Sequence, residues 1–118
     1  MKNELKFLLD TNFLMIPVQF KVDVFDELKN FGKGEVYTLD LVIEELKKLK
    51  RAKLILELIK KKEVKVLKSN LKSVDTQLFD LAKKGYIVCT QDKKLRKKLR
   101  ENGFKVVYLR QKKYLIME

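Results

Sequence analysis

The sequence contains no histidine, and Cys89 is its only cysteine. Without histidine, the chain cannot form a Ser-His-Asp or Cys-His nucleophilic site, a histidine-ligated zinc site or a paired-histidine ribonuclease site. A single cysteine excludes an internal disulfide, so we expect an intracellular, cytoplasmic protein. Any metal site must be built from oxygen ligands, which favours Mg²⁺ or Mn²⁺ over zinc.

Long apolar runs, prolines and glycines are also scarce. No apolar run approaches the ~20 residues of a membrane-spanning helix, and the N-terminus lacks the apolar core of a signal peptide, so we expect no membrane contact. Pro17 is the only proline, and the four glycines form no phosphate-binding loop. Because there is no linker, repeat or low-complexity tract, we expect residues 1–118 to form a single domain.

Basic residues outnumber acidic ones. The chain has 28 Lys and Arg against 16 Asp and Glu, which gives a formal net charge of +12. Such a field attracts polyanions, so nucleic acid is one interpretation and a merely solubilising surface is the other. The basic segments are "KKLKRAK" (47–53), "KKLRKKLR" (93–100) and "RQKK" (110–113). Within the second segment, the candidates for RNA phosphate contacts are Lys93, Arg96, Lys97 and Arg100.

Strand-like and helix-like segments alternate along the chain. The pattern predicts strands at 5–10, 35–40, 64–67, 86–90 and 105–109, with a candidate edge strand at 113–117. It predicts helices at 22–32, 41–50, 51–62, 73–85 and 92–103, and Pro17 is expected to break a helix after the first strand. This alternation favours an α/β fold with a central parallel sheet covered by helices on both faces, a three-layer α/β/α sandwich.

Carboxylates occur where strands are expected to end. Asp10 follows the apolar run 7–9, and Asp92 follows the fourth predicted strand, while Asp75 begins the helix that leads into that strand. Ligands bind beyond the carboxyl ends of parallel strands, so these three acids converge if the first and fourth strands are neighbours. Asp75 and Asp92 have a structural alternative, because an acid in the first turn of a helix caps it or complements its dipole. We interpret Asp40 as such an N-cap.

A further acid lies on the apolar face of a predicted helix. In the segment 41–50, Glu45 shares the helical stripe of Val42, Leu46 and Leu49, whereas Glu44 lies about 100° away and is expected at the surface. The alternative for Glu45 is a partly exposed edge residue paired with a lysine. Like charges cannot remain ionised together unless a cation lies among them. We therefore predict an all-oxygen site for a divalent metal ion.

Four segments together resemble the motifs of the PIN-domain nucleases. They are "FLLDTNFL", "VIEEL", "SVDTQLFDLA" and "IVCTQDKKLRKKLRENGFKVVYLR", which occur in the family's order and spacing over nearly the whole chain. The last is most similar to small archaeal PIN proteins that resemble the ribosomal-RNA processing nucleases of the small-subunit processome. The resemblance implies an α/β/α sandwich and an endoribonuclease that depends on Mg²⁺ or Mn²⁺.

The resemblance also implies residue roles. The catalytic, metal-binding acids correspond to Asp10, Glu45, Asp75 and Asp92. Thr11 corresponds to the hydroxyl that supports the first Asp, and Asn12 to the polar residue beside it. Thr76 stands where close relatives often have a second Asp, which implies weaker metal binding.

Three functions are compatible with the sequence. The first is an endoribonuclease in RNA maturation, for example of ribosomal RNA, with a ribosome-assembly partner. The second is a VapC-type toxin of a toxin–antitoxin pair, silenced by an antitoxin peptide in the acidic cleft. The third is a non-catalytic RNA-binding protein. PIN proteins often pair through helices, so Ile55, Leu56 and Ile59 are candidate homodimer contacts, with the core as their alternative.

Overall fold

The computed structural model describes residues 4–70 and 72–118. Its strands form one six-stranded sheet in the order β3-β2-β1-β4-β5-β6, in which β1 to β5 run parallel and β6 pairs antiparallel with β5. The strands are β1 (Leu5–Leu9), β2 (Gly34–Leu39), β3 (Lys65–Leu67), β4 (Ile87–Cys89), β5 (Val106–Arg110) and β6 (Tyr114–Met117). The expected α/β sandwich is confirmed, with one antiparallel strand added at its edge.

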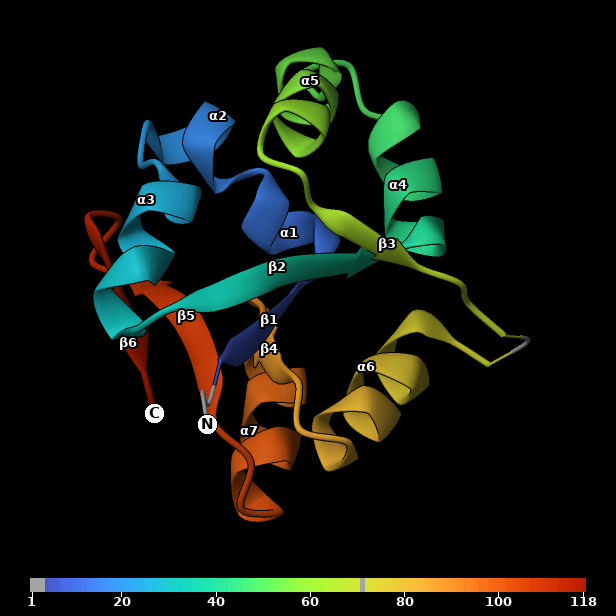
Figure 1. The fold of residues 1–118 in the computed structure, drawn as a ribbon, viewed down its shortest axis with the longest axis vertical. Coiled ribbons are helices and arrows are strands. Elements are labelled where there is room, and N and C mark those ends of the chain that lie inside the picture. Colours follow the sequence, from blue (N-terminus) through green and yellow to red (C-terminus); the bar gives the residue numbers. More distant parts are fainter. Residues whose placement is uncertain (1–3, 71) are drawn as a thin grey trace.

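Helices cover both faces of the sheet. Figure 1 shows α1 to α5 on one side of the strands and α6 and α7 on the other. The helices are α1 (Thr11–Leu14), α2 (Ile16–Phe20), α3 (Val24–Leu28), the 3-10 helix η1 (Lys29–Phe31), α4 (Asp40–Lys47), α5 (Lys53–Lys61), α6 (Val74–Lys83) and α7 (Lys93–Glu101). Within the described ranges, no helix is both long and apolar enough to span a bilayer.

The helical segment after β1 is interrupted, as Pro17 predicts. It ends as α1 and restarts as α2, and Pro17 occupies the first turn of α2. Proline lacks a backbone N–H, so it can begin a helix but cannot continue the hydrogen-bond ladder of the preceding one. The short α1 holds the residues after Asp10 close to the end of β1.

The direction of β6 follows from its short connection to β5. The connection covers residues 111–113, and Gln111 and Lys112 adopt positive φ angles of 55° and 57°. A parallel crossover needs about a dozen residues or more, whereas a tight turn joins antiparallel strands. Strand 113–117 was therefore expected in the right place, and its orientation makes the sheet mostly rather than wholly parallel.

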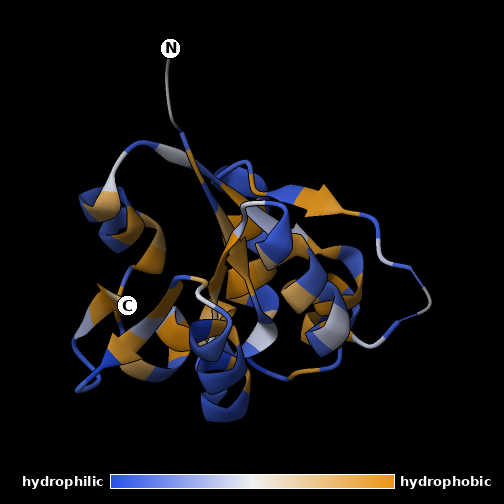
Figure 2. Ribbon diagram, turned by 90° about the horizontal axis from the view of Figure 1, so that it is seen from below, coloured by the Kyte–Doolittle hydropathy of each residue, from blue (hydrophilic) through white to orange (hydrophobic). Residues whose placement is uncertain are grey.

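The core is built from the central strands and the inward faces of the helices. Phe7, Leu8 and Leu9 of β1 are at most 2% exposed because β1 has strands on both sides and helices on both faces. In Figure 2 the central strands are mostly orange, and the surrounding helices mix orange with blue. Ile55 and Ile59 of α5 also belong to this core. These two residues are therefore core positions rather than homodimer contacts.

Candidate functional site

Asp10 lies where β1 ends, at the carboxyl edge of the sheet. Its side chain is only 7% exposed, and its Oδ1 accepts a hydrogen bond of 2.8 Å from the backbone N–H of Thr11, which caps α1. β4 is the direct neighbour of β1, with Leu9 paired to Cys89. The condition set by the sequence, adjacency of the first and fourth strands, is therefore met. Residues that follow β4 lie next to Asp10.

Thr90 is the residue that joins these two strand ends. Its hydroxyl is fully buried and donates to Asp10 Oδ2 at 2.9 Å. The oxygen of this Thr90 hydroxyl also accepts the Asp92 N–H at 3.2 Å. Asn12 Oδ1 accepts the Gln91 N–H at 3.0 Å and reinforces the contact. No sequence pattern marked Thr90, because threonine is common in strands. The available signal was a polar residue directly after a buried strand.

Glu45 reaches the site from α4. Its Oε1 accepts a 2.9 Å hydrogen bond from the hydroxyl of Thr11. The resemblance implies that the Thr11 hydroxyl supports Asp10. In the structure this hydroxyl contacts Glu45, and the hydroxyl that contacts Asp10 is that of Thr90. Glu45 is exposed, so its expected place among core side chains is wrong, although it does face the site. Glu44 points elsewhere and pairs with Lys47 at 3.1 Å on the surface, as expected.

A pocket of about 490 Å³ brings three of the four predicted acids together. Asp10, Glu45 and Asp75 line it, along with Thr11 and Asn12 and with Met15, Gln19, Leu49 and Val74. We call it the acidic pocket. Asp75 is in the first turn of α6 but does not cap it. Instead, Ser73 Oγ accepts the Thr76 N–H at 3.2 Å. The carboxylate of Asp75 is therefore not engaged as the cap of its helix.

Asp92 does not line the acidic pocket. It is the N-cap of α7, and its Oδ1 accepts the N–H groups of Lys94 at 2.9 Å and Leu95 at 3.3 Å. The capping alternative is therefore realised for this acid. Its other oxygen, Oδ2, makes no hydrogen bond or ion pair with the residues that the structure describes. Asp92 thus holds the start of α7 with one oxygen and keeps a second oxygen available.

Asp40 has a different role from the one expected. α4 begins at Asp40 itself, and Leu39 is the N-cap position without a side-chain bond. The Asp40 Oδ1 instead accepts the backbone N–H of Ser69 at 3.0 Å. The N-cap interpretation is wrong because the acceptor serves a loop 29 positions away. Asp40 fixes the segment after β3.

The electrostatics of the acidic pocket favour a cation. Burial raises the pKa of the Asp10 carboxyl above its ordinary value, and the nearby charges of Asp75 and Glu45 raise it further. Hydrogen bonds from the Thr11 N–H and the Thr90 hydroxyl act in the opposite direction. A positive ion among these carboxylates would stabilise the charged form of Asp10.

The donor set is compatible with a hard divalent ion. Within residues 4–70 and 72–118, no three acidic or cysteine side chains are close enough to hold one ion directly. Mg²⁺ usually keeps several waters and uses one or two carboxylates, so three carboxylates around a pocket of this size suit it. The chemistry of the pocket thus fits Mg²⁺ or Mn²⁺ held partly through water.

The predicted RNA-binding residues lie together on α7. Lys93, Arg96, Lys97 and Arg100 line one side of a pocket of about 500 Å³, and Tyr108 of β5 lines another. Glu101 and Glu118 complete the lining. We call it the α7–β5 pocket. The N-cap of α7 is Asp92, so this pocket starts close to the carboxyl edge of the sheet.

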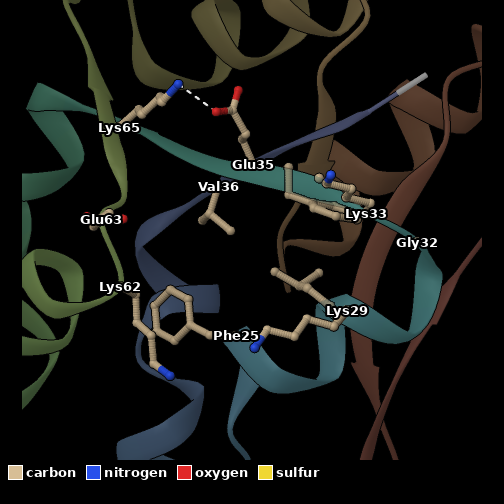
Figure 3. Close-up of a pocket in the computed structure, with 12 residues that line it drawn as sticks. Phe25, Lys29, Gly32, Lys33, Glu35, Val36, Lys62, Glu63 and Lys65 are labelled. Carbon is tan, nitrogen blue, oxygen red and sulfur yellow. Dashed lines mark hydrogen bonds and ion pairs between the residues drawn. The ribbon is translucent and has the colours of Figure 1, made fainter. Parts of the chain in front are cut away.

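A further cavity of about 640 Å³ lies toward the amino ends of β1 and β2. Figure 3 shows Val36 and Phe25 facing it, and Lys29 and Lys62 also line it. Glu35 is drawn on the other side of β2, with its Oε2 2.6 Å from Lys65 Nζ. The cavity contains none of the predicted catalytic acids. It is distinct from the candidate site.

Comparisons with known proteins identify the family of this chain. The model of the PIN-like domain family matches residues 7–112. Ribonuclease VapC4 of Methanocaldococcus jannaschii is 32% identical, over 92% of this chain and 93% of its own length. Ribonuclease VapC9 of Archaeoglobus fulgidus is also 32% identical, over 93% of this chain and 87% of its own length.

A solved structure is similar over most of its length. The PIN domain endonuclease Utp24 superposes with a TM-score of 0.81 at 25% identity, covering 96% of this chain and 90% of that one. The family model, the relatives and this superposition each cover most of the chain. The chain belongs to the PIN-like domain family.

Proposed function

We propose that this protein is an endoribonuclease that uses Mg²⁺ or Mn²⁺ to hydrolyse RNA phosphodiester bonds. The observation that carries the proposal is the acidic pocket, which Asp10, Glu45 and Asp75 line. The Thr90 hydroxyl links Asp10 to Asp92, the N-cap of the basic helix α7. Relatives named as ribonucleases and a structural relative named as an endonuclease support it. The absence of histidine is compatible with it, since metal-assisted hydrolysis needs no imidazole.

The residues of the acidic pocket would act as ligands and orienting groups. A bound divalent ion supplies a more acidic water and offsets negative charge at the phosphate. Asp10, Glu45 and Asp75 would hold the ion partly through bound water, and Asp92, which does not line the pocket, would supply Oδ2 as a fourth oxygen donor. Thr11 orients Glu45, while Thr90 orients Asp10. Asn12 secures the backbone at Gln91.

Substrate binding would use the positive face of α7. Lys93, Arg96, Lys97 and Arg100 would contact phosphates near the cleaved bond. The protein's net charge of +12 would draw RNA to this face and make binding sensitive to salt. The carboxylates repel phosphate, so the metal ion and the basic residues are both needed to bring the phosphodiester into the pocket.

A test is the cleavage of end-labelled single-stranded and structured RNA in Mn²⁺, Mg²⁺ or EDTA, with Asp10→Asn alongside. Metal-dependent cutting that the variant lacks is the expected result. RNA that is bound but not cut in any metal would contradict the nuclease and favour a non-catalytic RNA-binding protein. For a nuclease, the cellular role has two candidates.

The first role is RNA maturation, with ribosomal RNA as the candidate substrate. The second is that of a toxin in a toxin–antitoxin pair, which is supported by the VapC relatives at 32% identity. A small antitoxin gene directly upstream, whose product binds the protein and stops RNA cleavage, would identify the toxin. Without such a gene, the maturation role stands.

A further inference from the structure

The α7–β5 pocket contains more than positive charge. Its volume of about 500 Å³ is in the range of sites for small organic ligands. Arg96 lies about 6 Å along the helix axis from Asp92, at 1.5 Å for each residue. The pocket is therefore about one helical turn from Asp92 along α7.

Arg96 and Tyr108 form the flat wall of this pocket. The Cζ atom of Arg96 lies 3.8 Å from the centroid of the Tyr108 ring, so the guanidinium covers the ring. Tyr108 is fixed in β5, where it pairs with Ile116 of β6. A guanidinium held in this way is a planar surface of the kind on which RNA bases stack in proteins.

Arg96 also has an unused hydrogen-bond donor. Its Nε is buried and has no acceptor among the residues that the structure describes. A buried donor without an acceptor is unfavourable and is rare in folded proteins. A phosphate oxygen in the plane of the guanidinium could supply one. The stack on Tyr108 and the Nε–H thus offer a planar surface and a hydrogen-bond donor on one side chain.

The Arg100 guanidinium of this pocket already pairs with a carboxylate. Glu118 Oε1 lies 3.1 Å from Arg100 Nη1. The backbone of Glu118 is fixed by two hydrogen bonds of 2.9 Å with Val106, so the contact depends on an anchored residue. Carboxylate and phosphate oxygens bind guanidinium in the same way. Glu118 thus stands where a phosphate of the substrate can bind.

We propose that the α7–β5 pocket is a nucleotide-binding subsite for single-stranded RNA. One base stacks on the face of the Arg96 guanidinium opposite Tyr108. Lys93 and Lys97 contact the flanking phosphates, and Arg100 exchanges Glu118 for phosphate. The subsite rests on the proposed RNA substrate and adds a preference for an unpaired base, because bases stacked within a duplex cannot reach the guanidinium.

Binding of fluorescein-labelled ten-residue oligouridylate tests this subsite. The full chain is used in EDTA, so that the result is independent of cleavage. Arg96→Lys keeps the positive charge but removes the planar guanidinium. We expect this variant to bind oligouridylate about tenfold more weakly, which corresponds to the loss of one base stack. An otherwise identical oligomer without bases should bind Arg96→Lys and the unmodified protein alike. Equal affinity of the two proteins for oligouridylate would overturn the subsite.

Two further variants separate stacking from charge and folding. Arg51→Lys makes the same change at an exposed arginine that does not line the pocket, and it should leave binding unchanged. Glu118→Gln should tighten oligouridylate binding about twofold or more, because the competing carboxylate is removed. Weaker binding by Glu118→Gln would contradict the exchange. Circular dichroism establishes that Arg96→Lys is folded.

A titration with a single nucleotide provides a test that needs no RNA strand. Uridine 5′-monophosphate should shift the NMR signals of the Arg96 Nε–H and the Tyr108 ring. Inorganic phosphate at the same concentration should shift them less, and an equal shift would overturn base stacking. Both experiments are independent of the nuclease proposal. Metal-dependent cutting together with unaltered Arg96→Lys binding would remove only the subsite.

Discussion

Thr90 Oγ1 lies 2.9 Å from Asp10 Oδ2, although the two residues are 80 positions apart in the sequence. The contact exists because β1 and β4 run side by side, with Leu9 paired to Cys89. Thr90 Oγ1 also accepts the N–H of Asp92 at the start of α7. One buried hydroxyl therefore sets the orientation of Asp10 and the position of α7. Thr90 is a positioning residue for the acidic pocket.

Thr90→Val replaces this hydroxyl with a methyl group of similar size. We expect Mn²⁺ binding to weaken about tenfold or more, because groups that orient a metal ligand typically contribute 10- to 100-fold in affinity. The free energy of unfolding should fall by about 1 kcal/mol or more through the lost hydrogen bonds. Electron paramagnetic resonance of free Mn²⁺ measures the binding, and urea titration measures the stability.

Thr38→Val is the matched control. Thr38 is equally buried, and its hydroxyl donates to the Leu9 carbonyl at 2.7 Å. Thr38→Val should lower the free energy of unfolding about as much as Thr90→Val does, without changing the affinity for Mn²⁺. Equal losses of Mn²⁺ affinity in the Thr90 and Thr38 variants would show that the effect is general loosening of the sheet.

Asp10 should destabilise the metal-free protein at neutral pH. Burial raises its pKa in the folded state above the ordinary 3.8, so the folded state binds more protons than the unfolded state between these two values. The free energy of unfolding therefore falls as pH rises through this window and stays lower above it. Asp10→Asn should raise the melting temperature at pH 7, by about 4 °C for each kcal/mol regained. The difference in melting temperature between Asp10→Asn and the unmodified protein should shrink as the pH approaches 4.

Asp80→Asn provides a comparison of opposite sign. A hydrogen bond from Lys72 lowers the pKa of Asp80. The stability that Asp80 contributes to the folded state is therefore present above its ordinary pKa and is lost as pH falls through its lowered pKa. This substitution should not raise the melting temperature at pH 7. Differential scanning calorimetry in EDTA from pH 4 to 8 compares both variants. A melting temperature for Asp10→Asn below that of the unmodified protein at pH 7 would contradict the buried-charge account.

Asp92 has a capping role and a proposed ligand role, and two substitutions separate them. Asparagine is as good an N-cap as aspartate, so Asp92→Asn should keep stability but lose RNA cleavage. Asp92→Ala should lose cleavage and also about 1 kcal/mol of stability. Single-turnover cleavage in Mn²⁺ and thermal unfolding measure the two properties. Full activity of Asp92→Asn would assign this residue to the cap alone.

RNA binding should depend on salt through α7. Each phosphate contact contributes about −0.7 to the slope of log affinity against log salt concentration for single strands. Lys97→Ala should make the slope less negative by about that amount. Lys62→Ala, at the amino-end cavity of Figure 3, removes the same charge and should leave the slope unchanged. Similar changes in both variants would mean that RNA is held by diffuse charge.

Local patterns were sufficient for most elements and for distinguishing Glu45 from Glu44. The period of 3.6 residues separated Glu45 from Glu44, and the structure has Glu45 at the acidic pocket and Glu44 in a surface pair with Lys47. The same pattern could not say that Glu45 is exposed. The stripe continues to Leu49, which is 43% exposed and lines the acidic pocket rather than the core.

Roles that depend on distant neighbours were not predictable from local patterns. The hydrogen bond of Asp40 to Ser69 and that of Thr90 to Asp10 span 29 and 80 positions. Both require the strand order, which alternation alone does not specify. An acid just before a predicted helix is interpreted as its N-cap. The sequence pattern does not reveal whether the carboxylate instead accepts a hydrogen bond from a distant backbone N–H.

Two adjacent glutamates of α4 lie in different surroundings. Glu45 lines the acidic pocket and accepts the Thr11 hydroxyl, whereas Glu44 pairs with Lys47 on the surface. The measurement is single-turnover cleavage of end-labelled single-stranded RNA in Mn²⁺ by Glu45→Gln and Glu44→Gln. We predict at least a tenfold slower rate for Glu45→Gln and an unchanged rate for Glu44→Gln. Equal rates for the two variants would contradict the claim that the acidic pocket is the catalytic centre.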